Sequence, residues 1–356
     1  MEAIAPSEAD LLGEVRRAAV LPGSLALWYT GGAGYIGSHM VHELLERGER
    51  VVVLDNLTTG FRFLVPAQVP FVVGSTGDRD LVARTLRQHN IEAVIHFAAS
   101  IVVPDSVRDP LGYYRNNTLN TCNLVDVAIE CGVRQFIFSS TAAVYGNAEH
   151  VPVPEDEPTA PISPYGTSKL MSEIMLHDAG KAHGLRFVVL RYFNVASADP
   201  KGRTGQSTPQ ATHLIKVACE AALGKRAKVD VYGTDYPTPD GTCQRDYIHV
   251  SDLVSAHSAA LAHLRAGGAS STFNCGYGRG ASVFEVINSV KRVSGVDFKV
   301  DIAPRRDGDP AALIANVERI HASLDWQPQY QDLDTIVTHA LAWERKLPGK
   351  LQTAAA

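Results

Sequence analysis

The sequence is poor in cysteine: it contains five among 356 residues, and none belongs to a Cys-x-x-Cys pair. An odd number of widely separated cysteines indicates neither a zinc cage nor a disulfide framework. We therefore predict reduced cysteines with mostly structural roles and no metal site. The five are Cys122, Cys131, Cys219, Cys243 and Cys275.

Long apolar runs and an excess of positive charge are also missing. The most apolar stretch near the N-terminus, Ala18–Tyr29, is interrupted by Pro22 and Gly23 and is too short to span a bilayer. No basic leader with a small-residue cleavage site precedes it, so we expect a cytoplasmic protein in which residues 1–24 form an N-terminal extension. The formal net charge of −5 leaves no general cationic face for nucleic acid or anionic lipid. We expect neither nucleic acid nor a membrane as a partner.

Short apolar runs alternate with helical periodicity, which is typical of a parallel sheet covered on both faces. Helices are expected at Tyr35–Arg47, closed by Gly48, and at Asp78–His89, where Asp78 caps the first turn. Because strand–helix–strand connections of this kind are nearly always right-handed, we predict a doubly wound α/β fold. The six expected strands are Leu25–Tyr29, Arg50–Leu54, Pro70–Val73, Ala93–Phe97, Gln135–Phe138 and Arg186–Leu190.

A change in composition after Asn194 predicts a second, smaller lobe. Polar segments with glycine and proline separate amphipathic helices there. A chain with 45% hydrophobic residues can bury a core large enough for two lobes. We predict a Rossmann-type domain at 25–195, to which part of 240–278 returns, and a C-terminal α/β substrate lobe at 196–350. The expected helices of the later part are Thr212–Leu223, Ser251–Ala266 and Ser282–Ser294.

A glycine-rich segment, Thr30-Gly31-Gly32-Ala33-Gly34-Tyr35-Ile36-Gly37, joins the first expected strand to the first helix. Glycines in such a turn let the backbone approach a pyrophosphate at the helix N-terminus. Asp55 ends the second strand, where a carboxylate accepts hydrogen bonds from ribose hydroxyls and repels a 2′-phosphate, and Asn56 rather than arginine follows it. Together these features predict NAD binding in preference to NADP. The alternatives are an ordinary glycine-rich turn and an aspartate that caps a strand end.

Tyr165 and Lys169 lie four residues apart at the start of a predicted helix, so their side chains share one face. They follow the fifth strand, which ends in Ser139-Ser140-Thr141, and doubly wound folds hold their sites at such strand ends. A phenol has a pKa of about 10, and bringing it to about 7 takes roughly 4 kcal/mol of phenolate stabilisation. We expect Lys169 and a cationic nicotinamide to supply it, while Thr141 orients the substrate hydroxyl that Tyr165 deprotonates. The alternative is a half-buried helix tyrosine beside a surface lysine.

With these motifs in place, the sequence resembles the extended short-chain dehydrogenase/reductase family, and within it the UDP-galactose/UDP-glucose 4-epimerases, from about Leu25 to Leu347. The resemblance implies an enzyme in which UDP anchors the sugar while NAD transiently oxidises the 4-hydroxyl. The 4-keto sugar then turns over and the hydride returns to its opposite face. The shared strings are Thr-Gly-Gly-Ala-Gly-Tyr-Ile-Gly-Ser-His (30–39), Asp-Asn-Leu (55–57), His-Phe-Ala-Ala (96–99), Ser-Pro-Tyr-Gly-Thr-Ser-Lys (163–169), Arg-Tyr-Phe-Asn (191–194) and Arg-Asp-Tyr-Ile-His-Val (245–250).

The resemblance also implies contacts for individual residues, with catalytic roles for Tyr165, Lys169 and Thr141. Arginines suit a UDP-sugar site because each presents a planar fork to phosphate oxygens, although by sequence chemistry alone Arg245 and Arg306 also fit ordinary surface positions. The implied cofactor contacts are Gly31, Gly34, Tyr35, Ile36, Gly37, Asp55, Asn56, Ser75, Thr76, Phe97, Ala98, Ala99, Asn116, Tyr165, Lys169 and Phe193. The implied substrate contacts are Thr141, Asn194, His213, Leu214, Tyr232, Arg245, Arg306, Asp309 and Leu313.

Several positions separate the chain from related patterns. Sugar-nucleotide dehydratases place an Asp-Glu pair after the fifth-strand Ser/Thr, whereas Ala142-Ala143-Val144 follows Thr141 here, so elimination lacks its acid and base. Ser75 stands where the family usually has an aspartate on the adenine amino group, which predicts looser NAD retention. Ile101 occupies a position that is lysine in some epimerases. Leu313 stands where a tyrosine excludes N-acetylated sugars in some members, so we expect UDP-N-acetylhexosamines to be tolerated.

Other activities and the oligomeric state stay open at this point. UDP-N-acetylhexosamines or UDP-pentoses are alternative epimerase substrates, and a net nucleotide-sugar oxidoreductase would consume NAD(H) stoichiometrically. A non-catalytic NAD sensor would have lost Tyr165 or Lys169, and both are present. Family members commonly pair through helices that follow the fourth and fifth strands, here around Tyr113–Glu130 and Ser168–His183. A homodimer with a four-helix contact is therefore expected.

Overall fold

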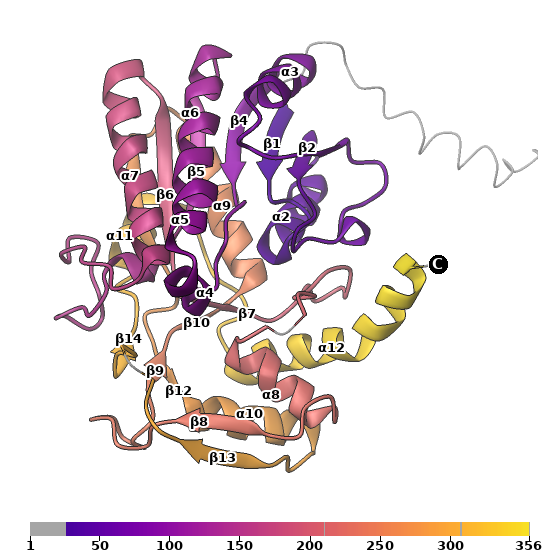
Figure 1. The fold of residues 1–356 in the computed structure, drawn as a ribbon, viewed down its shortest axis with the longest axis vertical. Helices are drawn as coiled ribbons and strands as arrows, with labels where there is room; N and C mark the ends of the chain where they lie inside the picture. Colours follow the sequence, from indigo (N-terminus) through magenta and orange to yellow (C-terminus); the bar gives the residue numbers. More distant parts are fainter. Residues whose placement is uncertain (1–25, 210, 307, 356) are drawn as a thin grey trace, which may run out of the picture.

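The computed structural model describes residues 26–209, 211–306 and 308–355. The expected N-terminal extension, residues 1–24, and Leu25 of the first expected strand lie outside the described residues. The strands of the main sheet are β1 Ala26–Thr30, β2 Val51–Asp55, β3 Phe71–Val73, β4 Ile91–His96, β5 Gln135–Thr141, β6 Arg186–Tyr192 and β11 Ser271–Cys275. They are all parallel, in the order β11-β6-β5-β4-β1-β2-β3 (Figure 1). Because the order reverses beside β1, the predicted doubly wound fold is confirmed.

All six predicted strands are present, and β5 and β6 extend the furthest beyond their predicted ends. β5 continues to Thr141 and β6 to Tyr192, and these two residues are paired across the strands. The extra residues are polar, but the neighbouring strand satisfies their backbone groups. The seventh strand, β11, was not predicted as a strand. It is an edge strand that pairs only with β6, and its residues Ser-Thr-Phe-Asn-Cys form no apolar run.

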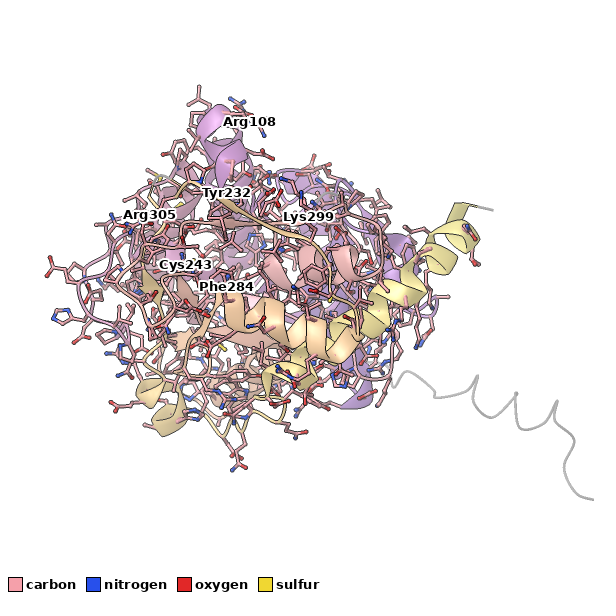
Figure 2. All side chains as sticks on the ribbon, turned by 90° about the horizontal axis from the view of Figure 1, so that it is seen from below. Arg108, Tyr232, Cys243, Phe284, Lys299 and Arg305 are labelled. Carbon is pink, nitrogen blue, oxygen red and sulfur yellow. The ribbon has the colours of Figure 1, made fainter. Side chains whose placement is uncertain are left out.

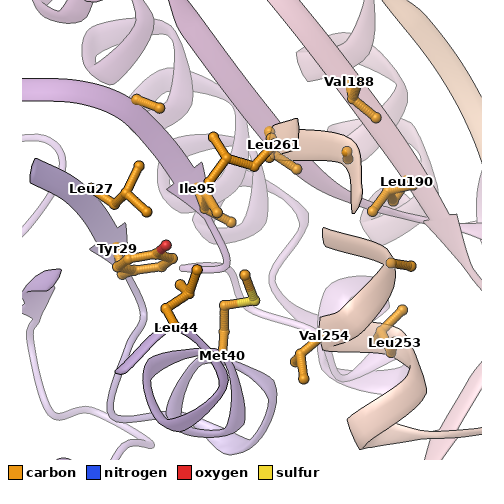
Figure 3. Packing of buried hydrophobic residues seen from close by; sticks show 14 of the residues in the cluster. Leu27, Tyr29, Met40, Leu44, Ile95, Val188, Leu190, Leu253, Val254 and Leu261 are labelled. Carbon is orange, nitrogen blue, oxygen red and sulfur yellow. The ribbon is translucent and has the colours of Figure 1, made fainter. Parts of the chain in front are cut away.

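Helices cover both faces of this sheet. The helices α2 (Tyr35–Glu46) and α9 (Val250–Arg265) lie on one face, and α3 (Arg79–His89), α6 (Asn120–Glu130) and α7 (Pro164–His183) lie on the other (Figure 1). Side chains of each strand alternate between the two resulting cores. Leu27 and Tyr29 of β1 pack with Met40, Leu44 and Leu253 on the first face (Figure 3), whereas Trp28 packs with Leu86, Leu124 and Leu176 on the second.

Local sequence signals explain where these helices begin and end. The Asp78 carboxylate accepts a hydrogen bond from the Leu81 N–H at 3.0 Å, as predicted for the cap of α3. Gly48, just beyond α2, has a φ of 76°, a left-handed conformation that glycine adopts without strain. At α7, the Ser163 hydroxyl caps the first turn by accepting from the Gly166 N–H at 3.2 Å.

A smaller group of elements lies below the sheet in Figure 1 and has its own apolar core. Its parallel pair is β8 (Val229–Tyr232) with β13 (Val300–Ala303), packed on α8 (Leu214–Ala222), α10 (Val283–Ser294) and the long α12 (Leu333–Ala355). The short strands between this group and the main sheet are β7 Asn194–Ala196, β9 Gln244–Arg245, β10 Tyr247–His249, β12 Ala281–Ser282 and β14 Ala312–Leu313.

The remaining helical segments are short. They are η1 Arg62–Leu64, α4 Val103–Arg108, α5 Pro110–Tyr113, the π-helical η2 Tyr114–Leu119, η3 Ala142–Val144 and α11 Glu318–Ser323. Within the described ranges, no helix has the length and apolar character needed to cross a bilayer.

Candidate active site

The sequence-predicted cofactor residues lie at the C-terminal ends of neighbouring parallel strands. The glycine-rich turn follows β1, Asp55 ends β2, and Ser75 and Thr76 follow β3. Phe97–Ala99 follow β4 and Phe193 follows β6. Because the ends of parallel strands meet at one edge, residues distant in sequence form a single site beside the switch in strand order.

The glycine-rich turn forms a cradle that side chains would fill. Gly31 has a φ of 75°, and a Cβ built on it would lie 2.7 Å from the Ala98 nitrogen. A Cβ on Gly37 would lie 2.1 Å from the Gly31 oxygen. The cap residue of α2, Gly34, offers no side-chain hydrogen bond, and the first turn contains no acidic residue. The N–H groups at this helix start therefore suit a phosphate.

Asp55 is buried with a fixed carboxylate. Its Oδ2 accepts from the Ala33 N–H at 2.9 Å and its Oδ1 from the Leu57 N–H at 2.8 Å. Burial raises the pKa of this carboxyl, and the two hydrogen bonds oppose the shift. A carboxylate has about four acceptor positions, so two remain for ribose hydroxyls. Asn56 beside it is exposed and uncharged. The glycine-rich turn, Asp55 and Asn56 together fit an NAD-type dinucleotide.

The outer cofactor positions are held by local hydrogen bonds and ring contacts. Ser75 is half-buried, and its Oγ accepts from the Gly77 N–H at 3.1 Å. The Phe97 ring lies 5.0 Å from the His257 ring, and the Asn116 amide of η2 donates to the Ser100 hydroxyl at 2.9 Å. A serine hydroxyl is a weaker acceptor for an adenine amino group than a carboxylate, so the expectation of a weaker contact at Ser75 stands as a prediction.

The three predicted catalytic residues come from adjoining elements. Thr141 ends β5, and its side chain hydrogen-bonds the phenol of Tyr165 in the first turn of α7. Lys169 follows one turn later and is 2% exposed, with its Nζ 4.6 Å from the centroid of the Phe138 ring. The Tyr113 ring meets the Tyr165 ring edge-on, with centroids 6.5 Å apart. The structure thus brings phenol, hydroxyl and ammonium to the strand ends that line the cradle.

The electrostatics of this trio differ from the sequence-based expectation. Burial raises the pKa of Tyr165 to about 12, although the Thr141 hydrogen bond opposes the shift. Burial also lowers the pKa of Lys169 to about 7, against the attraction of Glu173. The expectation that Lys169 lowers the tyrosine pKa is therefore not met by the protein's own residues, because desolvation disfavours both charged forms. The same expectation also included the positive charge of an oxidised nicotinamide, which would stabilise the phenolate.

Two pairs of sequence-predicted substrate residues meet in the smaller group of elements. The Arg245 guanidinium is 2.7 Å from the Asp309 carboxylate and donates to the Pro310 oxygen at 2.9 Å. The Arg306 guanidinium lies 3.7 Å from the centroid of the Tyr232 ring. In the view from below, Tyr232 lies at the same end of the molecule as Cys243 and Arg305 (Figure 2). Arg306 on the Tyr232 ring is a cationic, aromatic pair suited to a nucleoside diphosphate, whereas the Arg245 guanidinium is buried and engaged by Asp309 and Pro310.

Asn194, His213 and Leu214 line one small cavity. His213 caps α8 and Leu214 begins it, while Asn194 begins β7 directly after Phe193. Elsewhere, Leu313 packs against the apolar cluster that includes Ala142 and Phe193, and its backbone pairs with Arg245. The residues predicted to contact the nucleotide-sugar therefore extend from the arginines to the turn that follows Thr141. In the described part of the chain, no group of three His, Cys, Asp or Glu side chains is placed to hold a metal ion.

Several buried polar residues at this site were not singled out from the sequence. The Asn117 side chain joins the Ser100 backbone to the Ser168 hydroxyl, with contacts of 2.8 to 3.0 Å. The Asp246 carboxylate accepts from the backbone N–H groups of Tyr277, Gly278 and Ala315. Glu173 and Arg191 form a buried ion pair behind Lys169. Arg191 and Asp246 occur within the shared strings of the sequence, and this is the signal that could have found them.

The comparisons with known proteins agree with this geometry. A family model described as the NAD dependent epimerase/dehydratase family matches residues 29–276. The chain is similar to a UDP-glucose 4-epimerase of Azospirillum brasilense, with 58% identity over 92% of this chain and 94% of that protein. It is also similar to the solved UDP-glucose 4-epimerase from Brucella ovis in complex with NAD, with 44% identity, a TM-score of 0.87, and coverage of 90% of this chain and 98% of that one. The UDP-Glc/GlcNAc 4-epimerase from Campylobacter jejuni shares 47% identity, with a TM-score of 0.81 and coverage of 91% and 100%. Because the family model spans most of the chain, the chain belongs to the NAD dependent epimerase/dehydratase family.

Proposed function

We propose that this chain is an NAD-dependent UDP-glucose 4-epimerase, an isomerase that interconverts UDP-galactose and UDP-glucose. The observation that carries the proposal is the contact between the Tyr165 phenol and the Thr141 side chain at the sheet edge that also holds the glycine cradle. A base and a hydroxyl-orienting group are there placed beside a dinucleotide site. The 58% identity to a UDP-glucose 4-epimerase across nearly the whole chain supports the same activity.

We assign the proton chemistry to the protein's own side chains. Tyr165 takes the proton of the sugar 4-hydroxyl, and Thr141 holds that hydroxyl in place. Lys169, one helical turn away, stabilises the phenolate in a site with little water. The cradle of Gly31, Gly34 and Gly37 with Asp55 would hold NAD, which would supply a reversible hydride acceptor for C4, so that the reaction would involve no net oxidation.

We assign the anchoring of UDP to the arginines of the smaller group of elements. Arg306, stacked on Tyr232, presents its guanidinium fork for the diphosphate, and Arg245 beside Asp309 supplies a second guanidinium. Asn194, His213, Leu214 and Asp309 complete the proposed nucleotide-sugar contacts. We further propose that 25–195, with part of 240–278, holds NAD, and that 196–350 holds the UDP-sugar. A diphosphate held at a distance from the sugar ring allows the ring to turn over between the two hydride steps.

The residues after Thr141 argue against elimination of water. The turn η3 consists of Ala142, Ala143 and Val144, none of which can act as an acid or a base. A dehydratase needs both groups beside the reacting carbons. Hydride return without elimination is therefore the reaction that these residues support.

A second candidate activity is epimerisation of UDP-N-acetylhexosamines. Leu313 is paired with Arg245 and packs on the cluster that also holds Ala142 and Phe193, and we assign it to the wall near the sugar. Leucine leaves more room there than the tyrosine found in some relatives. The similar protein from Campylobacter jejuni is named for both UDP-Glc and UDP-GlcNAc. UDP-pentoses, which lack the exocyclic carbon, are a further alternative.

We also propose a cytoplasmic homodimer. Apolar side chains are exposed on the two segments named from the sequence: Leu119 is 60% exposed, Met171 43% and Ile174 53%. A face of this kind is suited to pairing with a second copy through η2, α6 and α7. All five cysteines are free in the structure, as a reducing compartment requires.

The test is to mix the purified protein with UDP-galactose, add no NAD, and follow the anomeric proton signals by NMR. We expect a mixture of UDP-glucose and UDP-galactose to form, with cofactor carried by the protein. Activity only after NAD is added supports weak retention at Ser75, whereas net accumulation of NADH indicates an oxidoreductase. No conversion of UDP-galactose with NAD present would contradict the proposed function.

A further inference from the structure

A buried ion pair lies one helical turn beyond Lys169. The Oε2 atom of Glu173 is 2.6 Å from Nη2 of Arg191, and the two side chains are only 3% and 8% exposed. Nε of Arg191 is also 3.2 Å from both carboxylate oxygens. Apolar residues of similar volume often give equal or greater stability than a buried ion pair, so the pair points to a role other than stability.

The Glu173–Arg191 pair connects α7, the catalytic helix that carries Tyr165 and Lys169, to the strands β5, β6 and β11. The Ser140 hydroxyl donates to Oε1 of Glu173, and Ser140 is paired with Arg191 in the β5–β6 register. Nη1 of Arg191 donates to the Tyr145 hydroxyl at 2.9 Å, which donates to the Asn274 side-chain oxygen of β11 at 2.7 Å. Ser140 directly precedes the last residue of β5, so the network fixes the catalytic helix against the strand end that holds the substrate hydroxyl.

The charges of this group leave one cation unmatched. Lys169, Glu173 and Arg191 are all buried, which gives two positive charges and one negative charge, while the nearby Glu155 carboxylate is paired with Arg319. Arg191 and Ser140 occupy the Glu173 oxygens, and among the residues that the structure describes no ion pair joins Glu173 to Lys169. The ammonium of Lys169 therefore keeps a free charge one turn from Tyr165, where a phenolate would balance it.

We propose that Glu173 is a positioning residue whose carboxylate, held by Arg191 and Ser140, keeps Lys169 charged without neutralising it by direct contact. The proposal rests on the proposed function of Tyr165 and Lys169. It assigns Arg191 the task of withholding Glu173 from Lys169, so that the lysine charge is available to the phenolate.

The surroundings of Lys169 support this assignment. Burial lowers the pKa of Lys169 to about 7, and the charge of Glu173 is the attraction that opposes this shift. On β4, His96 faces the lysine but is neutral near pH 7, because burial, and then the lysine charge, lower its pKa to about 3. On α7 the facing titratable group is Tyr165 itself, with Tyr113 of α5 beyond it. Phe138 of β5 contributes a ring and no charge.

Three variants separate charge from shape. Glu173→Gln keeps the size of the side chain and removes its charge, but it leaves Arg191 buried without a partner and risks misfolding. The double variant Glu173→Gln/Arg191→Met removes both charges and avoids that risk. Glu173→Asp keeps the negative charge. Glu157→Gln is the matched control, because Glu157 is a buried carboxylate whose partners are His150 and the Glu149 backbone.

The first measurement is the pH profile of kcat with UDP-galactose, on NAD-loaded protein. In Glu173→Gln and in the double variant, we expect the alkaline limb to move to lower pH by about one unit, because an opposite charge nearby shifts a pKa by roughly 1–3 units. KM should change by less than about threefold, because Glu173 acts through Lys169 and not on the substrate. A tenfold change would equal about 1.4 kcal/mol of binding. Glu173→Asp and Glu157→Gln should keep the parent profile. A folded Glu173→Gln variant with the parent profile would overturn the proposal.

The second measurement needs no turnover, so it distinguishes the two proposals. Tyrosinate absorbance is titrated in the NAD-loaded parent and in the double variant, each minus its own Tyr165→Phe form. We expect Tyr165 to ionise at higher pH in the double variant, because the lysine charge that stabilises its phenolate costs more free energy to maintain without Glu173. A shifted titration in a protein that does not convert UDP-galactose would retain the positioning role and refute the epimerase activity. An unchanged titration would refute the positioning role whatever the activity.

Discussion

The guanidinium of Arg306 lies 3.7 Å from the centroid of the Tyr232 ring, and the neighbouring Arg305 lies 4.1 Å from the ring of Tyr236. The two arginines differ in their other partners. Arg305 is paired with the Asp235 carboxylate at 2.6 Å, whereas Arg306 stacks on its tyrosine with its fork available to a diphosphate. Substitution of Arg306 therefore tests the proposed diphosphate contact, and substitution of the adjacent Arg305 is its control.

We predict that Arg306→Ala raises KM for UDP-galactose by about ten- to a hundredfold, the effect of losing hydrogen bonds to a charged group. Arg306→Lys should fall between the parent and Arg306→Ala, because an ammonium is a point charge without the planar fork. Arg305→Ala should change KM by less than about twofold on the scale of exposed ion pairs. Steady-state kinetics on the three variants would settle the assignment, and equal effects at both arginines would contradict it.

Removal of the phenolic hydroxyl should abolish the proton transfer. We predict that Tyr165→Phe lowers kcat by about 10² to 10⁴, the usual contribution of a general base, with little change in KM. Tyr113→Phe is the control, because its hydroxyl donates to the Val102 oxygen at 2.6 Å and its ring contacts Tyr165. Retention of more than a tenth of the parent kcat in Tyr165→Phe would exclude it as the base.

Restoring a carboxylate at position 75 should tighten cofactor retention. An aspartate would accept a charge-assisted hydrogen bond from the adenine amino group, which is worth about 1.5–3 kcal/mol. We predict that Ser75→Asp keeps more NAD than the parent after extensive dialysis, measured by the cofactor released on denaturation. Ser75→Asn, a neutral acceptor, should lie between the two. A parent protein that retains one NAD per chain would remove the basis of this prediction.

Enlarging residue 313 should narrow the sugar preference. Leu313 contacts the cluster of Ala142 and Phe193, so a larger ring there would fill space beside the sugar. We predict that Leu313→Tyr lowers activity on UDP-N-acetylgalactosamine at least tenfold relative to UDP-galactose, by about 1.4 kcal/mol of discrimination. Leu313→Met, similar in volume, should leave the ratio near that of the parent. The same ratio in all three proteins would show that residue 313 is no gate.

The lowered pKa of Asp199 leads us to predict that the protein loses stability in acid. Burial opposes ionisation, but hydrogen bonds from the Arg203 side chain and backbone hold its pKa at about 2. Because this folded value lies below the unfolded value of about 3.9, the stabilisation is complete above about pH 5 and is lost as pH falls toward 2.

We therefore expect Asp199→Asn to melt about 2 °C below the parent at pH 7 and to approach it near pH 3. Thermal unfolding curves from pH 7 to about pH 3 would measure this convergence. Asp297→Asn is the control, since that side chain is 87% exposed, and its curve should stay parallel to the parent. Parallel curves for Asp199→Asn would contradict the prediction.

The strands that could be predicted from the sequence are those whose own residues form a recognisable strand pattern. Five of the six predicted strands are mostly buried apolar runs bounded by turns, as strands covered on both faces must be, and the edge strand β3 is partly exposed. β11 escaped prediction because Ser271–Cys275 is short and partly polar, and its pairing partner β6 lies far away in sequence. The helix α9 was predicted, but only the fold shows that it packs on α2.

The site residues divide in a similar way. Motif residues such as Tyr165 and Asp55 were found because each motif joins a residue type to a defined turn or helix. Asn117, Glu173 and Asp246 escaped because their roles depend on partners from other elements, and a buried polar residue has no periodic signature. The effects of burial on the pKa values of Tyr165 and Lys169 could not be predicted for the same reason, since burial is a property of the folded chain.

The last strand of the main sheet also constrains how the chain folds. β6 remains an open edge until residues 271–275 have been synthesised, so the cofactor-binding sheet cannot be completed before most of the later elements exist. A parallel pairing between segments so distant in sequence forms slowly, because the entropy of closing a long loop is lost before any stabilising contact forms. A nascent or truncated chain that ends before Ser271 would expose the β6 edge to other chains and would tend to aggregate.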